Sequence, residues 1–216
     1  IHDIGSGNFL DSTDFELPYE PTILESVNEG ADITLFSGDK LLGGPQCGII
    51  VGKKNYIEKI NKNPLARAAR VDKLNLFILN SILKKYISKD SKNKIFSWEL
   101  IDIKQKELLI RAEKILEQLS NKYFSLKNTS STIGGGTFPE TTLDSIAIVM
   151  HEDKFIMKLE KYLLNLSTPI LGKIENGMLM LDLRTIFSEY DSYLIENLNN
   201  GKTTNVISPS KSLLVF

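Results

Sequence analysis

The stretch LFSGDKLLGGPQCG, residues 35–48, places a lysine between an apolar run and a glycine-rich loop. The chain has 26 lysines and arginines, and Lys40 differs from most of them because it directly follows a strand-like run. Burial disfavours the charged form of a lysine, and an uncharged amine attacks carbonyl carbons. Lys40 is therefore a candidate to bind the aldehyde of pyridoxal phosphate. On spacing alone, a surface lysine in a tight turn explains the pattern better.

Pyridoxal phosphate also needs a carboxylate for its ring nitrogen and polar groups for its phosphate. Asp3 closes a short apolar run before Gly5, and Ser37 lies three residues before Lys40. A strand, a helix and a second strand would bring Asp3 and Lys40 to one sheet edge, where α/β folds bind ligands. Asp3 also fits a turn-capping aspartate. Asp39 either adjusts the reactivity of the Lys40 amine or is simply exposed to solvent.

Arg67 and Arg70 follow Pro64, which suits the start of a helix. Their spacing of three predicts that they share one helical face, where two guanidiniums suit a phosphate-like anion. Two solvated arginines on an exposed helix fit the spacing as well. These two residues are candidates for an anion site.

The elements that would position these residues alternate between strand and helix, which predicts an α/β fold for residues 1–127. The short run 31–38 contains Ile33, Leu35 and Phe36, and the run 47–53 contains three consecutive apolar residues, Ile49–Val51. Apolar runs of this kind are typical of strands buried on both faces. The other expected elements are a strand end at 1–4, a turn at 5–8 and helices over 21–30, 54–63, 65–87 and 98–123. The lysine-rich link 84–94 is expected to be a solvated turn.

A second, smaller α+β domain is expected over 128–201. The segment 169–186 predicts a β-hairpin that turns at Asn176-Gly177. The other expected elements are a loop around Gly134–Gly136, a strand over 145–153 and helices over 153–167 and 187–201. Residues 202–216 form a tail to which no role is assigned.

The composition excludes several classes of protein. The net charge of −1 gives no overall basic field for DNA. Two histidines and one cysteine, Cys47, give no zinc-ligand spacing, so we expect no metal site. No apolar stretch reaches the roughly 20 residues that span a bilayer, and a single cysteine fits the cytoplasm. Because the first residue is Ile1, we expect the chain to be a fragment of a longer protein.

Several motifs together resemble the bacterial selenocysteine synthase family, the L-seryl-tRNA(Sec) selenium transferases. The motifs are DIGSGNFLD, SGDKLLGGPQCG, NPLARAARVDK, IGGGTFPETTL and PILGKIENGMLMLDLRTI, and the resemblance runs from residue 1 to about residue 198. It implies a fold type I pyridoxal-phosphate enzyme with a large α/β domain and a small C-terminal α+β domain.

The resemblance also implies a chemistry. Lys40 would bind the cofactor, Asp3 would face its ring nitrogen, and Arg67 and Arg70 would lie in the active site. The family converts L-seryl-tRNA(Sec) to L-selenocysteinyl-tRNA(Sec) through an aminoacrylyl intermediate, with selenophosphate as selenium donor. Its members are homo-oligomers with active sites between subunits and are about twice this length. We therefore expect these 216 residues to be inactive alone.

Two alternatives remain open from the sequence. A related pyridoxal-phosphate lyase or transferase would use Lys40 on a small amino acid without tRNA. A non-catalytic remnant would only bind a partner or oligomerise. Arg184 fits either a carboxylate-binding or a structural role. Cys47 is expected to be a small buried side chain rather than a selenium carrier.

Overall fold

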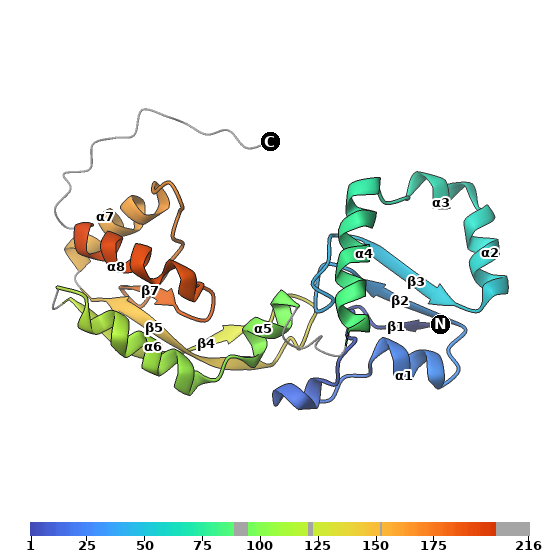
Figure 1. The fold of residues 1–216 in the computed structure, drawn as a ribbon, viewed down its shortest axis with the longest axis horizontal. Helices are drawn as coiled ribbons and strands as arrows, with labels where there is room; N and C mark the ends of the chain where they lie inside the picture. Colours follow the sequence, from blue (N-terminus) through green and yellow to red (C-terminus); the bar gives the residue numbers. More distant parts are fainter. Residues whose placement is uncertain (89–94, 121–122, 152, 202–216) are drawn as a thin grey trace. The chain divides into compact units, whose positions relative to one another are not determined.

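The computed structural model describes residues 1–88, 95–120, 123–151 and 153–201, so the tail at 202–216 lies outside the described residues. The chain forms two compact units (Figure 1). Unit 1 comprises Ile1–Asp102 and Thr132–Leu143, and unit 2 comprises Ile103–Ser131 and the chain from Asp144 onward. Unit 1 carries Lys40. Among the described residues, no helix is both long enough and apolar enough to span a membrane.

A three-stranded sheet forms the centre of unit 1 (Figure 1). Strand β1 (His2–Asp3) pairs in parallel with β2 (Ile33–Ser37), and β2 pairs antiparallel with β3 (Gly48–Gly52). Helix α1 (Ile23–Asn28) connects the two parallel strands. This β–α–β connection confirms the predicted α/β class.

Helix α1 begins with a capping box. The Thr22 hydroxyl accepts from the Glu25 backbone N–H at 3.1 Å, and the Glu25 carboxylate accepts from the Thr22 N–H at 2.7 Å. This exchange satisfies two of the backbone donors that a helix start leaves unpaired. The sequence pattern suggested that Pro21 begins the helix, but Pro21 precedes the cap.

Strand β3 differs from the expectation of burial on both faces. Its residues alternate between exposed and half-buried, and Ile50 is exposed. The reason is its place in the sheet, since among the described residues β3 pairs only with β2 and so lies at the edge. The apolar run predicted the strand but not its position in the sheet.

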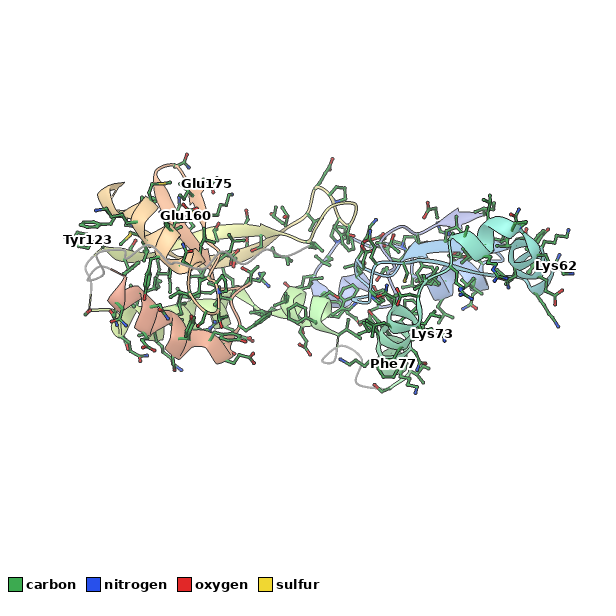
Figure 2. All side chains as sticks on the ribbon, turned by 90° about the horizontal axis from the view of Figure 1, so that it is seen from above. Lys62, Lys73, Phe77, Tyr123, Glu160 and Glu175 are labelled. Carbon is green, nitrogen blue, oxygen red and sulfur yellow. The ribbon has the colours of Figure 1, made fainter. Side chains whose placement is uncertain are left out.

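The expected helix over 65–87 is two helices. Helix α2 (Lys54–Lys62) leads to the short α3 (Pro64–Ala68), and α4 (Lys73–Ile87) starts separately. The Asp72 carboxylate accepts from the backbone N–H groups of Leu74 and Asn75 at 2.8 and 3.0 Å and so caps α4. Phe77 of α4 is exposed (Figure 2).

The expected helix over 98–123 is also two helices. Helix α5 (Phe96–Asp102) belongs to unit 1, and α6 (Gln105–Glu117) belongs to unit 2. The chain therefore changes unit between two apolar helical stretches. Of the expected solvated turn at 84–94, residues 89–94 lie outside the described residues.

Two apolar clusters form the core of unit 1. The Trp98 cluster consists of Phe15, Leu17, Leu41, Ile95, Trp98, Ile101 and Phe138, and the Ile4 cluster consists of Ile4, Ile23, Phe36 and Leu42. Leu41 and Leu42 are adjacent in the chain and 2% and 0% exposed. The residues that follow Lys40 therefore enter different clusters.

Unit 2 contains a four-stranded sheet in the order β4-β5-β7-β6. The strands are β4 (Phe124–Thr132), β5 (Thr142–Met150), β6 (Lys173–Glu175) and β7 (Met178–Asp182), and the helices are α6, α7 (Asp153–Leu164) and α8 (Asp191–Asn200). The β6–β7 hairpin turns at Asn176 and Gly177 with φ of 50° and 70°, which confirms the predicted Asn-Gly turn.

An arginine of α6 joins three parts of unit 2. The Arg111 guanidinium donates to both Asp191 carboxylate oxygens at 2.6–3.1 Å. It also donates to the backbone carbonyls of Leu183 and Ile186, both at 2.8 Å. The side chains of Arg111 and Asp191 are largely buried, so this network fixes the segment between β7 and α8.

Candidate functional site

The candidate site lies at one edge of the unit 1 sheet. Asp3 is the last residue of β1 and Ser37 the last of β2, and the two strands are parallel. The backbone N–H of Ile4 still donates to the Leu35 carbonyl at 2.8 Å, which keeps the strands in register up to this edge. Asp3 and the turn that carries Lys40 therefore leave the sheet on the same side, as the sequence predicted.

The side chains of Asp3 and Lys40 meet beside Gly5. A Cβ atom placed on Gly5 would lie 3.6 Å from Lys40 Nζ and 3.8 Å from Asp3 Oδ1. The amine and the carboxylate therefore both lie within 4 Å of this position. Lys40 is half-buried and Asp3 is exposed. Among the residues that the structure describes, Lys40 forms no ion pair, so its amine stays available.

The glycine-rich loop after β4 also reaches Lys40. A Cβ atom placed on Gly136 would lie 3.0 Å from Lys40 Nζ and 3.7 Å from Cε. Gly136 has a φ of 75°, which favours glycine. The sequence predicts only a loop here. Nothing in the local pattern of Gly134–Gly136 indicates a contact with Lys40, which lies far earlier in the chain.

The turn that carries Lys40 is held at both ends. The Gly43 N–H donates to the Lys40 carbonyl at 2.9 Å, and the φ of 70° at Gly43 closes the turn. Between them, Leu41 inserts into the Trp98 cluster and Leu42 into the Ile4 cluster. Burial of these two leucines anchors the backbone of the turn and leaves the lysine side chain free to project.

A tyrosine that sequence analysis missed supports the same turn. The Tyr86 hydroxyl lies 3.2 Å from the carbonyls of both Leu41 and Leu42 and donates to them. Ser97 donates to the Leu41 carbonyl at 3.0 Å, and Trp98 Nε1 donates to the Tyr86 oxygen at 3.2 Å. Burial raises the pKa of Tyr86, so the hydroxyl keeps its proton and remains a donor. The apolar spacing of α4 predicts which side of the helix faces the core, but it does not predict this hydrogen bond.

The loop after β1 is bound to the lysine turn. The Leu41 N–H donates to the Ser6 carbonyl at 3.0 Å, and the Ser6 hydroxyl donates to Glu20 at 2.6 Å. Asn8, which is fully buried, donates to the Glu20 carbonyl at 3.0 Å. This chain of hydrogen bonds keeps Gly5 beside Lys40.

Backbone hydrogen bonds close the loop between β2 and β3, which runs from Gly38 to Cys47. The Gly38 N–H donates to the Cys47 carbonyl at 2.8 Å, and the Gly44 N–H donates to the Gly38 carbonyl at 2.7 Å. A side chain on Gly38 would collide with Cys47 Sγ. Burial, followed by the negative charge of Asp39, raises the pKa of the Cys47 thiol. Asp39 itself is exposed.

Arg67 and Arg70 are placed differently from the prediction. Helix α3 has five residues and ends at Ala68, so Arg70 lies outside it and the two residues do not share a helical face. The C-cap of α3 is Ala69, and Asp72 then caps the next helix, α4. Both arginines are exposed. The segment follows the end of β3 that is remote from the lysine turn, because Gly48 and not Gly52 pairs with Ser37. Among the described residues, no ion pair joins either arginine to a carboxylate near Lys40.

Arg184 has a structural environment. It is 5% exposed, and its guanidinium donates to the Asp144 carbonyl at 2.6 Å. Its backbone N–H donates to Asp182, whose carboxylate also accepts from the hydroxyls of Ser131 and Ser145 at 2.5 Å. Burial lowers the pKa of the Arg184 guanidinium, and the charges of Asp182 and Asp144 oppose that shift. These contacts join β4, β5 and β7.

The residues at the sheet edge fit pyridoxal phosphate. The cofactor needs an amine for its aldehyde carbon and a carboxylate for its ring nitrogen. Lys40 Nζ and Asp3 Oδ1 lie 3.6 and 3.8 Å from the Cβ position of Gly5, so this edge of the sheet offers both groups. Gly5 has no side chain that would fill the space beside them. Ser37 is half-buried at the end of β2, and its contact with the phosphate stays a prediction.

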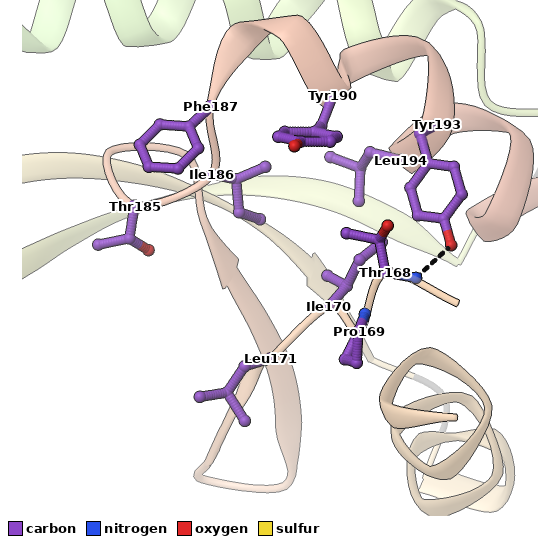
Figure 3. Close-up of a pocket in the computed structure, with 10 residues that line it drawn as sticks. All are labelled: Thr168, Pro169, Ile170, Leu171, Thr185, Ile186, Phe187, Tyr190, Tyr193 and Leu194. Carbon is purple, nitrogen blue, oxygen red and sulfur yellow. Dashed lines mark hydrogen bonds between the residues drawn. The ribbon is translucent and has the colours of Figure 1, made fainter. Parts of the chain in front are cut away.

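Unit 2 has a separate pocket of about 440 Å³ (Figure 3). Its wall is mostly apolar, and the Thr168 N–H donates to the Tyr193 hydroxyl at 3.3 Å. The lining residues are Thr168, Pro169, Ile170, Leu171, Thr185, Ile186, Phe187, Tyr190, Tyr193 and Leu194. None of these ten carries an amine or a carboxylate, so this pocket does not offer the chemistry of the Lys40 site.

Comparison with known proteins agrees with the resemblance seen in the sequence. Residues 1–187 match the family model described as L-seryl-tRNA selenium transferase. The chain belongs to this family.

Curated relatives carry the name L-seryl-tRNA(Sec) selenium transferase. The protein from Desulfotalea psychrophila is 42% identical over 193 residues, which cover 86% of this chain and 41% of the relative. Those from Clostridium perfringens and Carboxydothermus hydrogenoformans are 40% and 39% identical, and each alignment covers 88% of this chain and 42% of the relative. The chain thus spans less than half the length of these relatives.

Two solved structures show a distant similarity. Serine palmitoyltransferase from Sphingomonas wittichii is 11% identical with a TM-score of 0.34, over 92% of this chain and 46% of that one. LysN, an α-aminoadipate aminotransferase from Thermus thermophilus complexed with N-(5'-phosphopyridoxyl)-L-leucine, is 14% identical with a TM-score of 0.36. The match covers 92% of this chain and 48% of the aminotransferase chain. The family assignment therefore rests on the family model and the curated relatives.

Proposed function

We propose that this chain carries the cofactor-binding lysine of a fold type I enzyme that converts L-seryl-tRNA(Sec) to L-selenocysteinyl-tRNA(Sec), with selenophosphate as selenium donor. The observation that carries the proposal is the meeting of the Lys40 amine and the Asp3 carboxylate beside Gly5. Membership of the family and the names of the relatives support the choice of substrate.

Each residue at the sheet edge has a distinct role in the proposal. When bound, pyridoxal phosphate supplies an electron sink that stabilises negative charge at the substrate α-carbon. Lys40 would hold the cofactor through its aldehyde carbon, and its amine, when free, would take the proton from the serine α-carbon. The Asp3 carboxylate would accept a hydrogen bond from the protonated ring nitrogen and so keep that nitrogen protonated. The Ser37 hydroxyl and nearby backbone N–H groups hold the phosphate.

The overall reaction exchanges one group at the β-carbon of the seryl residue. The serine hydroxyl would leave as water after the α-proton is lost, selenium from selenophosphate would add to the same carbon as the α-carbon regains a proton, and hydrolysis of the Se–P bond would release phosphate. Arg67 and Arg70 are the proposed site for the selenophosphate anion, because guanidiniums bind phosphate oxygens in pairs.

The position of these arginines supports a site shared between subunits. They follow the end of β3 remote from the lysine turn, and both are exposed. A homo-oligomer would bring the Arg67–Arg70 segment of one copy to the Lys40 edge of another. We place this assembly, and its encounter with tRNA, in the cytoplasm.

The surroundings of Arg184 bear on the alternative function. A lyase or transferase for a free amino acid would need a guanidinium that faces the substrate carboxylate. Arg184 is buried and donates to the Asp144 carbonyl, which supports a structural role. The tRNA-linked substrate has no free carboxylate, so it makes no such demand.

The first test is cofactor binding by the purified chain. Addition of pyridoxal phosphate is expected to give an absorbance band near roughly 420 nm that borohydride removes, with the reduced cofactor attached to Lys40 in a peptide mass map. Lys40→Ala should lose the band. Lys62→Ala, which changes an exposed lysine of α2, should keep it. A band that survives in Lys40→Ala, or labelling spread evenly over the lysines, would refute the proposal.

The second test concerns the substrate. Protein that contains this chain and binds the cofactor is incubated with seryl-tRNA(Sec) that carries a label on the serine. The label should be recovered as selenocysteine only when selenophosphate is present. Turnover of free serine at a comparable rate, with no requirement for tRNA, would favour the amino-acid alternative instead.

A further inference from the structure

The amine of Lys40 lies between two glycines that are far apart in the sequence. Gly5 follows β1, and Gly136 lies in the loop between β4 and β5, yet both belong to unit 1. The amine lies 3.6 Å from the Cβ position of Gly5 and 3.0 Å from that of Gly136. A real Cβ atom at 3.0 Å would be in unusually tight contact, so the lysine amine would have to shift by a few tenths of an ångström. The space that Gly136 leaves is therefore occupied by the end of the lysine.

We propose that Gly136 is a positioning residue for Lys40. Its backbone forms one wall of the slot in which the amine faces Gly5 and Asp3, and its missing side chain gives the amine room. This role rests on the proposed function of Lys40 and assigns a purpose to the glycine-rich loop. Gly136 acts through Lys40 and not on the substrate.

The core of unit 1 fixes the distance between this wall and the lysine. Phe138, two residues after Gly136, is 8% exposed and belongs to the Trp98 cluster. Leu41, the residue after Lys40, belongs to the same cluster. Phe138 also has a φ of 46°, a costly conformation for an aromatic residue that surrounding packing must maintain. One apolar cluster thus anchors both the loop and the lysine turn.

The three consecutive glycines provide matched controls. Gly134 has a φ of 135° and no atom within 4 Å of its Cβ position. Gly135 has the same open space without a positive φ. Gly136 alone of the three combines a positive φ with a neighbour, and that neighbour is Lys40. Alanine at Gly134 therefore tests backbone strain, and alanine at Gly135 tests the added methyl group.

The experiment measures the reactivity of Lys40 in the purified chain with two reagents. Pyridoxal phosphate with borohydride reports the productive position of the amine, and acetic anhydride reports its access to solvent. Peptide mass spectrometry gives the labelling of Lys40 relative to exposed Lys62. In Gly136→Ala, pyridoxal phosphate labelling of Lys40 should fall about fivefold, and acetylation should rise, because the methyl group displaces the amine from its position beside Gly5 and Asp3. Gly134→Ala and Gly135→Ala should each stay within about twofold of the unchanged chain.

The outcomes separate the two proposals. If both reagents label Lys40 to the same extent in Gly136→Ala and in Gly134→Ala, the proposed positioning role of Gly136 is wrong. If the unchanged chain shows no preference of pyridoxal phosphate for Lys40, the proposed function fails, and the acetylation comparison still decides the positioning role. If Gly136→Ala does not fold, Gly136→Asn replaces it, because asparagine tolerates a positive φ.

Discussion

At the residue scale, the candidate site combines groups that sequence could predict with groups that it could not. Lys40 and Asp3 were predicted from their places at the ends of apolar runs, and the structure brings them together. Gly136 was not predicted as a neighbour of Lys40. Its contact depends on where Phe138 packs, and that is decided by the Trp98 cluster, not by local sequence. Spacing predicts contacts between neighbouring strands better than contacts made by a returning loop.

The Cys47 thiol offers a pH-dependent test at the same scale. Its pKa is raised by burial and then by the charge of Asp39, so less thiolate is present at neutral pH than in an ordinary cysteine. Alkylation by iodoacetamide should be slower than that of a small thiol and should accelerate as the pH rises through the raised pKa. Asp39→Asn removes the negative charge, so it should lower the thiol pKa and increase the rate at pH 8.

Asp32→Asn is the control for this measurement, because Asp32 pairs with Lys53 at the other end of β2. It should leave the alkylation rate of Cys47 unchanged. Equal acceleration by both substitutions would show that the effect of Asp39 is not local.

At the scale of elements, apolar pattern predicted most strands and failed where polar side chains decide the ends of helices. The strands over 31–38 and 47–53 and the hairpin turn at Asn176 agree with the structure. The break before α4 was missed because it depends on a cap by Asp72, which does not change the apolar spacing. Strand β4 was missed because its sequence, FSLKNTSST, is mostly polar and becomes a strand by pairing with β5.

The hydroxyl of Tyr86 in α4 is expected to stabilise the turn that carries Lys40. Tyr86→Phe removes the hydroxyl that donates to the carbonyls of Leu41 and Leu42. The Leu41 carbonyl keeps the Ser97 hydroxyl as a donor, but the Leu42 carbonyl and Trp98 Nε1 lose their partner. An unpaired buried polar group is costly, so the free energy of unfolding should fall by about 1–3 kcal/mol in a urea titration. Labelling of Lys40 by pyridoxal phosphate should fall as well, because the turn loses a support. Tyr19→Phe, at a tyrosine that is 61% exposed, should change neither quantity. Loss of stability without any effect on Lys40 would mean that the turn does not depend on this hydroxyl.

At the scale of the whole molecule, the division of the chain differs from the boundary expected at residue 127. Helix α6 belongs to unit 2 because Leu108, Ala112 and Ile115 pack in its core, and Thr132–Leu143 belongs to unit 1. The change of composition suggested a single domain boundary. In the structure, the chain leaves unit 1 after Asp102, returns to it over Thr132–Leu143 and then leaves again. A linear reading of composition cannot reveal such a return.

Arg111 tests whether the two units respond separately. Arg111→Ala leaves Asp191 and two backbone carbonyls without their donor, so unit 2 should lose about 2–3 kcal/mol of stability. Hydrogen exchange read by mass spectrometry should accelerate in β7 and α8 and stay unchanged in β2 and α4. Lys114→Ala, at an exposed residue of the same helix, is the control. Equal acceleration in both units would show that they unfold together.

The turn between Lys40 and Gly43 also limits how this sequence can change in length. Surface loops usually accept added or deleted residues. Here Leu41 and Leu42 enter separate clusters on consecutive residues, so one inserted residue would pull a leucine from its cluster or shift the amine away from Asp3. Insertions should therefore be tolerated at the exposed hairpin turn of Asn176 and Gly177 and selected against between Lys40 and Gly43.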